Sequence, residues 1–128
     1  MTTLVSIVAP AHNEQDNIDR LVEEVGRAGA AVAEAFGGSP ADFEFVIVDD
    51  GSTDQTRARV RALMPSRPWL RCVAMTNTPP GKGNGQSAAF HAGFRACRGE
   101  FVGVLDADLQ NDPADYVAMA HLMKRENA

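Results

Sequence analysis

The sequence alternates short apolar runs with segments of helical periodicity, and this alternation is the feature that most restricts its fold. The apolar runs consist mainly of Val, Ile, Phe and Leu without strict polar alternation, which is typical of strands covered on both faces in a parallel sheet. They span residues 4–9, 43–48, 70–75 and 101–105. Segments of helical period follow them, at residues 18–36, 52–64, 86–97 and 113–124. This order predicts a doubly wound α/β fold, in which a parallel sheet carries helices on both faces through right-handed crossovers.

The length fits a single domain with one hydrophobic core. A chain of 128 residues is long enough to bury most of its apolar surface on folding. We therefore treat residues 1–128 as one domain. No fifth strand is expected after the last predicted helix, and a sheet of four strands is small for this fold class. We expect the chain to be the N-terminal portion of a larger domain.

The charge of the chain argues against two classes of partner. The net charge is -5, and the lysines and arginines form no dense run, so neither nucleic acid nor an anionic membrane is expected to bind this segment. The first ten residues lack the basic and apolar regions of a signal peptide. No apolar stretch approaches the ~20 residues of a membrane span. We expect a cytoplasmic location, with any membrane contact made by residues outside this chain.

Polar residues gather directly after the predicted strands. In parallel α/β sheets, ligands bind beyond the carboxyl ends of the strands, where the strand order reverses. The loops at that edge are residues 10–14, 49–54, 76–85 and 106–112, and three of the four carry carboxylates immediately after an apolar strand. The sequence therefore predicts a binding site at this edge of the sheet.

The loop after the fourth strand contains a candidate metal site. Asp106, Asp108 and Gln110 occupy alternate positions, and alternate side chains of an extended segment share a face. Their oxygen atoms suit Mg2+ or Mn2+. An acidic turn that leads into the next helix explains the aspartates equally well, because Asp112 followed by Pro113 is a good N-cap. The residues alone leave both interpretations open.

The loop after the second strand begins with two adjacent carboxylates, Asp49 and Asp50. Adjacent carboxylates at a strand end repel each other, so the fold must supply donors or a cation for each. Residues 52–55 resemble a capping box that opens the next helix, which gives Ser52 and Asp54 a structural role. Asp50 has no such explanation. This favours a ligand-binding role for the acidic pair.

The loop after the first strand has a largely structural interpretation. We expect Pro10 to end the strand and Asn13 to cap the following helix. Glu14 would then lie in the first helical turn, where a carboxylate is favoured. Physical reasoning alone assigns no function to this loop.

Three ordered motifs resemble the N-terminal half of a family 2 glycosyltransferase. They are VSIVAPAHNE, VIVDDGSTD and GQSAAFHAGFRACRGEFVGVLDADLQNDP, and together they extend over nearly the whole chain. The resemblance is greatest to the dolichyl-phosphate mannosyltransferase group, which moves a hexose from a nucleotide sugar onto a polyprenyl phosphate. It implies the GT-A fold, a Rossmann-like sheet that starts with strand order 3-2-1-4. It also implies an inverting enzyme that uses a UDP- or GDP-hexose.

The resemblance also assigns roles to individual residues. The nucleotide would contact Pro10, His12, Glu14, the backbone of Val48, Asp50, Asp106 and Ala107. Asp106 and Asp108 correspond to the DXD pair, and Gln110 completes the set of metal ligands. His12 stands where the family often has Tyr or Phe. An imidazole can still stack on a base, so the resemblance does not specify which base is bound.

A mechanism follows from the charges in the implied reaction. Negative charge develops on a β-phosphate oxygen as the nucleoside diphosphate leaves, and a metal ion stabilises it as a Lewis acid. A lipid phosphate is already anionic near pH 7, so positioning it suffices and we assign no catalytic base. We expect the chain alone to bind metal and nucleotide weakly and to turn over poorly, because the acceptor side is missing.

Two alternative functions compete with this interpretation. Receiver domains of signalling proteins also bind Mg2+ with an acidic pair after one strand and an aspartate two strands later, as in Asp49, Asp50 and Asp106. In receivers, however, the pair follows the first strand, and Asp108 and Gln110 would be unexplained. The second alternative is a non-catalytic nucleotide-binding module, which only an assay of the full-length chain distinguishes.

Overall fold

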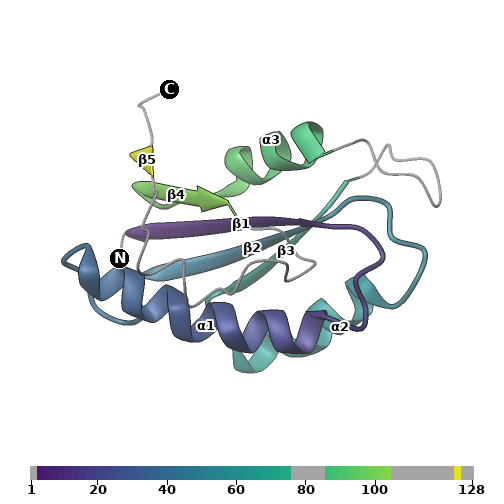
Figure 1. Ribbon diagram of the computed structural model, residues 1–128, viewed down its shortest axis with the longest axis horizontal. Coiled ribbons are helices and arrows are strands. Elements are labelled where there is room, and N and C mark those ends of the chain that lie inside the picture. Colours follow the sequence, from purple (N-terminus) through teal and green to yellow (C-terminus); the bar gives the residue numbers. More distant parts are fainter. Residues whose placement is uncertain (1–2, 76–85, 105–122, 125–128) are drawn as a thin grey trace.

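The fold is built on one sheet. The computed structural model describes residues 3–75, 86–104 and 123–124. Their strands form a five-stranded sheet of order β3-β2-β1-β4-β5, in which the first four strands are parallel and β5 is antiparallel to β4 (Figure 1). The strands are β1 (Val5–Ala11), β2 (Phe43–Asp49), β3 (Leu70–Ala74), β4 (Phe101–Val104) and β5 (Met123–Lys124). The predicted α/β class and the strand order 3-2-1-4 are confirmed.

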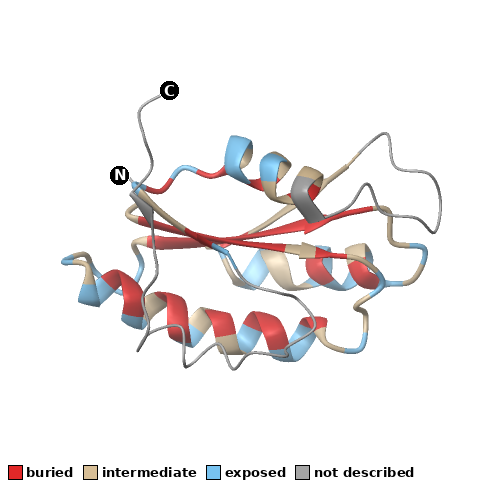
Figure 2. Ribbon diagram, turned by 45° about the horizontal axis from the view of Figure 1, so that its top comes forward, coloured by how far each residue is buried: buried red, intermediate tan, exposed pale blue. Residues whose placement is uncertain are grey.

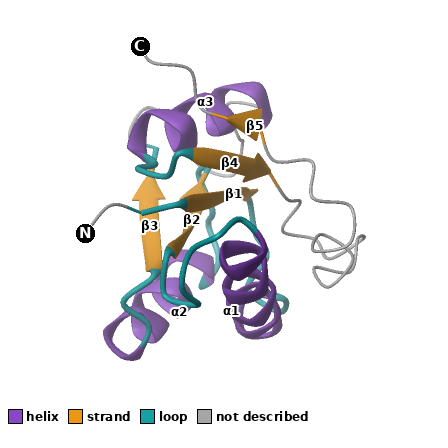
Figure 3. Ribbon diagram, turned by 90° about the vertical axis from the view of Figure 1, so that its left-hand side faces the viewer, coloured by secondary structure: helices purple, strands orange, loops and turns teal. Residues whose placement is uncertain are grey.

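Helices cover both faces of the sheet. They are α1 (Ile18–Ala35), α2 (Thr56–Leu63) and α3 (Gln86–Ala96), and a short 3-10 turn η1 (Met64–Ser66) follows α2. Helices α1 and α2 pack on one face, and α3 packs on the other (Figures 1 and 3). The three layers bury both faces of the central strands β1 and β2, which explains why these two strands are almost continuously apolar.

The larger core lies between the sheet and helices α1 and α2. Helix α1 presents its apolar stripe to the sheet, with Leu21, Val22 and Val25 at most 1% exposed. Alternate residues of β2 point to this core, including Phe45 and Ile47. The intervening Val46 and Val48 point to the second core, under α3. Figure 2 shows the buried strands between helices that are buried only on their inner sides.

A close approach of α3 to the sheet depends on Gly93. A Cβ atom at Gly93 would lie 2.3 Å from Val8 Cγ1 and 3.1 Å from Val48 Cγ2. Any larger residue would therefore push α3 away from the strands.

Two element ends differ from the sequence prediction. Strand β1 continues through Pro10 to Ala11, whereas we expected Pro10 to end it. The pairing of β1 with β4 reaches only Val8, so Pro10 pairs with β2 alone among the described strands, and a proline is tolerated at such a position. The predicted last helix is wrong at residues 123–124, which form β5 beside β4. The rest of that prediction lies outside the described residues.

Within the described ranges, no helix is both long and apolar enough to cross a membrane.

Candidate functional site

The carboxyl ends of β1 and β2 lie side by side, at the edge where the sequence predicts a site. The strands are in register to their last residues, with Ala11 opposite Asp49. Asp50 N–H donates a hydrogen bond of 2.9 Å to the Ala11 carbonyl, which continues the contact beyond the strands. The first loop, residues 12–17, and the second loop, residues 50–55, therefore leave the sheet together (Figure 1).

Hydrogen bonds tie the beginnings of the two loops to each other. Nδ1 of His12 lies 2.7 Å from the carbonyl oxygen of Asp50. Asn13 N–H donates to Ser52 Oγ at 2.9 Å, and Thr53 N–H donates to Asn13 Oδ1 at 2.8 Å. These bonds fix the first residues after β1 against the first residues after β2.

The same pattern continues towards helices α1 and α2. Glu14 N–H donates to Thr56 Oγ1 at 2.8 Å, and Gln15 N–H donates to Asp54 Oδ2 at 3.3 Å. In return, Gln55 N–H donates to Gln15 Oε1 at 2.9 Å. Backbone groups that would otherwise need water thus find partners in the opposite loop, and the two loops form one cross-linked unit.

The expected capping role of Asn13 is wrong. Helix α1 begins at Ile18 after Asn17, and no side chain caps its first turn. Asn13 instead bonds across to the second loop. Glu14 precedes the helix rather than lying in its first turn, and its Oε2 accepts a hydrogen bond of 3.1 Å from Asn17 Nδ2. Asparagine at this position suits a helix cap, but Asn13 bonds to Ser52 and Thr53 in the loop after β2 instead.

The predicted capping box in the second loop is wrong, because the residue before helix α2 is Gln55 and its side chain makes no capping hydrogen bond. Asp54 nevertheless bonds to the first residue of the helix. Helix α2 begins at Thr56, and Asp54 Oδ1 accepts from the Thr56 N–H at 2.9 Å. Ser52 faces the first loop and does not cap. Desolvation raises the pKa of Asp54, but hydrogen bonds from Thr56 and the Gln15 N–H outweigh it, so that the pKa of Asp54 lies below its ordinary value.

The two adjacent aspartates have different surroundings. Asp49 is fully buried, its Oδ2 lies 2.7 Å from Arg57 Nε, and its Oδ1 accepts from the Ser52 N–H at 3.4 Å. Arg57 belongs to α2 and supplies the cation that an acidic pair at a strand end requires. Asp49 thereby has a structural partner. The ligand role of Asp50, which is 5% exposed, stays a prediction.

Loss of this ion pair should destabilise the second loop. We expect Arg57→Gln to reduce the free energy of unfolding by about 2 kcal/mol, because it leaves a buried carboxylate with weaker donors. Urea unfolding followed by circular dichroism measures this. Arg59→Gln is the matched control, since Arg59 and Asp19 form an exposed pair at 3.5 Å and should contribute less than about 1 kcal/mol. Equal losses in the two variants would contradict the structural role of Arg57.

The structure brings together those predicted nucleotide-binding residues that it describes. Pro10, His12 and Glu14 are half-buried at the end of β1, and Asp50 follows β2 beside them. Val48 is fully buried, and its side chain lies in the core under α3, so this side chain cannot contact a ligand.

The predicted metal ligands and Ala107 lie outside the described residues. Strand β4 ends at Val104, which pairs in parallel with Val8, so β4 leads towards the same edge as β1. Asp106 follows Val104 by two residues in the sequence. Among the residues that the structure describes, no three His, Cys, Asp or Glu side chains form a possible metal site.

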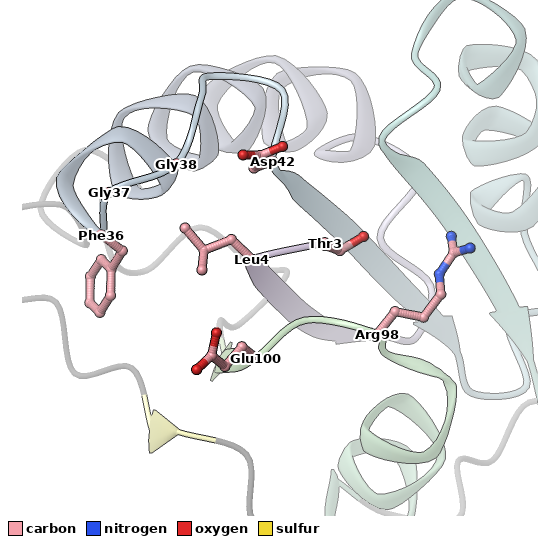
Figure 4. A pocket seen from close by; sticks show the side chains of 8 residues that line it. All are labelled: Thr3, Leu4, Phe36, Gly37, Gly38, Asp42, Arg98 and Glu100. Atoms are coloured by element: carbon pink, nitrogen blue, oxygen red, sulfur yellow. The ribbon is translucent and has the colours of Figure 1, made fainter. Parts of the chain in front are cut away.

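A cavity of about 440 Å³ lies at the opposite edge of the sheet, before the amino ends of β1, β2 and β4 (Figure 4). Its lining residues are Thr3, Leu4, Phe36, Gly37, Gly38, Asp42, Arg98 and Glu100. None of them is a predicted site residue. The cavity is therefore separate from the candidate site at the carboxyl edge.

Solved structures share this fold. The chain superimposes on S. aureus TarS 1-349 with a TM-score of 0.66 and 24% identity, which covers 91% of this chain and 31% of that one. The mannosyltransferase PcManGT from Pyrobaculum calidifontis, solved in complex with GDP-Man and Mn2+, gives a TM-score of 0.62 and 24% identity over 84% of this chain and 28% of that one. These neighbours confirm the GT-A fold that the sequence motifs implied.

Sequence comparisons identify the family. A dodecaprenyl-phosphate galacturonate synthase of Rhizobium johnstonii is 35% identical over 94% of this chain and 32% of its own length. An undecaprenyl-phosphate 4-deoxy-4-formamido-L-arabinose transferase of Edwardsiella ictaluri is 37% identical over 87% of this chain and 31% of its own length. The chain thus spans about a third of the length of these relatives. Because the model of glycosyl transferase family 2 matches residues 6–128, the chain belongs to this family.

Proposed function

We propose that the chain forms the nucleotide-sugar-binding part of an enzyme that transfers a sugar from a nucleotide sugar to polyprenyl phosphate. The observation that carries the proposal is the pair of cross-linked loops at the carboxyl edge, which holds His12, Glu14 and Asp50 together in a chain of this family. The two relatives described above are named for sugar transfer to polyprenyl phosphates. The acceptor of such a reaction lies in a membrane, so the whole enzyme would work at a membrane surface.

The nucleoside would bind between the ends of β1 and β2. Pro10, His12 and Glu14 would line the base and ribose from one side, with the imidazole of His12 stacked on the base. Asp50 and the backbone of Val48 would contact the nucleoside from the other strand. Structural neighbours were solved with UDP and with GDP-Man, and we propose a UDP- or GDP-hexose as the donor.

The diphosphate would bind where β4 ends. Asp106 and Ala107 would contact the nucleotide, and Asp106, Asp108 and Gln110 would hold Mg2+ or Mn2+ through oxygen atoms. Arg57 already neutralises Asp49, so Asp49 is not a candidate for this set. A bound divalent cation would supply Lewis-acid stabilisation of the leaving diphosphate.

The reaction would be a single displacement that inverts the anomeric centre. The acceptor phosphate is anionic near pH 7 and needs no general base from this chain, so the protein's task is to align donor and acceptor. The match to glycosyl transferase family 2 spans residues 6–128 and disfavours the phosphoacceptor alternative.

Calorimetric titration of the chain with UDP and with GDP, each with and without Mn2+, tests the proposal. We expect one nucleotide to bind more tightly than the other, and Mn2+ to strengthen its binding, because a cation held by Asp106, Asp108 and Gln110 would supply positive charge to attract the diphosphate. Equal heats with and without Mn2+ would count against metal-dependent binding. An absence of heat with both nucleotides would contradict the proposed function.

A further inference from the structure

Asn13 has an unusual backbone conformation for its position. Its φ is 54°, and it is the one non-glycine residue with positive φ in the described part of the chain. The left-handed region is unfavourable for most residues and is best tolerated by glycine and asparagine. Asn13 is also exposed, so its side chain contributes nothing to the core. An exposed residue that keeps a strained conformation indicates a role other than packing.

Two polar groups of Asn13, one from its backbone and one from its side chain, bond to the second loop. Its N–H donates to Ser52 Oγ at 2.9 Å, and its Oδ1 accepts from the Thr53 N–H at 2.8 Å. The pair is reciprocal, because each loop gives one backbone N–H and one side-chain oxygen. The left-handed turn brings the backbone and the side chain of Asn13 to the same part of the second loop.

The residues on either side of Asn13 are the ones that we assign to the nucleoside. His12 contacts the Asp50 carbonyl through Nδ1 at 2.7 Å, and Glu14 N–H donates to Thr56 Oγ1 at 2.8 Å. Asn13 therefore lies at the centre of the contacts that set His12 and Glu14 against Asp50. Without the two bonds of Asn13, only the contact of His12 with Asp50 and the contact of Glu14 with Thr56 would hold this part of the first loop in place.

We propose that Asn13 is a positioning residue for nucleotide binding, an inference that rests on the proposed function. Asn13 does not touch the nucleotide. It fixes the first loop on the second before the nucleotide arrives, so that binding does not have to order the site. A site that is already ordered binds more tightly, because the binding free energy is not reduced by the entropy cost of ordering the loops.

Three substitutions separate the backbone turn from the side-chain bond. Asn13→Gly keeps the left-handed turn but loses the acceptor for Thr53, and we expect its nucleotide affinity to fall about five- to tenfold. Asn13→Ala loses the acceptor and strains the turn, so its affinity should fall further. Asn13→Asp keeps both features and should bind more tightly than Asn13→Gly. Calorimetry with Mn2+ and whichever of UDP and GDP binds the unsubstituted chain measures these affinities.

Gly37→Ala is the matched control. Gly37 has a φ of +92°, and a Cβ atom added to it would meet no other atom within 4 Å. It lines the cavity before the amino ends of the strands, away from the two loops. The substitution imposes similar backbone strain without touching the loops. We expect it to lower the melting temperature and leave nucleotide affinity unchanged. If Gly37→Ala weakens binding as much as Asn13→Ala, the effect is one of stability and the proposal is overturned.

Hydrogen exchange at the Thr53 amide gives a readout that does not need a ligand. We expect this amide to be protected in the free chain and to lose protection in Asn13→Gly. Nucleotide affinity within twofold of the unsubstituted chain in Asn13→Gly would overturn the positioning role. A chain that binds neither UDP nor GDP would contradict the proposed function and the positioning role with it, and Thr53 protection would then show that Asn13 serves the fold alone.

Discussion

Asp108→Asn is expected to weaken Mn2+-dependent nucleotide binding by at least about 100-fold, because changes to residues that only support metal ligands already cost 10–100-fold. The substitution keeps the size of the side chain and one oxygen atom but removes the negative charge that attracts the cation. Calorimetric titration with nucleotide at fixed Mn2+, repeated without metal, measures the loss. Binding in the absence of metal should be the same in the variant as in the unsubstituted chain.

Asp112→Asn is the matched control for this prediction. Asp112 is the predicted helix cap in the same stretch, and Asn is an equally good cap. We expect this variant to keep its metal-dependent binding. If Asp112→Asn loses as much affinity as Asp108→Asn, general electrostatic attraction rather than a defined ligand accounts for the metal effect.

Glu44→Gln is expected to cause the second large effect, on stability. Glu44 is 3% exposed at the start of β2. Its Oε2 accepts from Ser6 Oγ and from the Arg98 N–H, both at 2.6 Å, and its Oε1 accepts from Arg71 Nη1 at 2.8 Å. Gly99 N–H in turn donates to Ser6 Oγ at 2.7 Å. One carboxylate thus joins β1, β2, β3 and the turn before β4, and its loss should cost about 3 kcal/mol of unfolding free energy.

The effect of this substitution should depend on pH. Desolvation raises the pKa of Glu44, but hydrogen bonds from Ser6, Arg98 N–H and Arg71 outweigh it and hold the pKa below its ordinary value of 4.5. Because the pKa is lower in the folded state, the stabilisation is complete above 4.5 and is lost as the pH falls below that value. Urea unfolding from about pH 7 to about pH 3 should therefore show Glu44→Gln and the unsubstituted chain converging in acid.

Arg98→Ala tests whether exposed charge or buried hydrogen bonding gives Glu44 its role. The Arg98 side chain is 66% exposed, with Nε 3.5 Å from Glu44 Oε1, and the variant keeps the backbone N–H that bonds to Glu44. We expect a loss of less than about 1 kcal/mol. A loss as large as that of Glu44→Gln would show that the exposed ion pair is the main contribution.

Local patterns in the sequence were sufficient to predict the first four strands and helix α1. The apolar runs predict four strands because valine, isoleucine and phenylalanine suit a sheet buried on both faces. The periodicity from Ile18 onward predicts α1 almost to its last residue, since each turn repeats the same requirement for an apolar side chain. Strand β5 escaped prediction because a pair of residues, Met123 and Lys124, carries no periodicity of its own.

The details of the candidate site depend on contacts between distant residues. Ser52 and Asn13 are residue types that commonly cap helices, and local reasoning assigned them that role. Their actual partners lie 39 and 40 residues away in the sequence. The Asp49–Arg57 pair depends in the same way on how α2 packs under β2. Asparagine's tolerance of left-handed backbone was the one local signal that could have identified the turn at Asn13.

The sequence by itself determined the α/β class, the order of the strands through its family motifs, and the edge of the sheet where polar residues gather. Only the tertiary structure decided which donors and acceptors meet at that edge, because parallel pairing of β1 with β2 is what brings the two loops within hydrogen-bonding distance. A side chain that can cap a helix bonds across to a neighbouring strand's loop when that loop offers a better-placed partner.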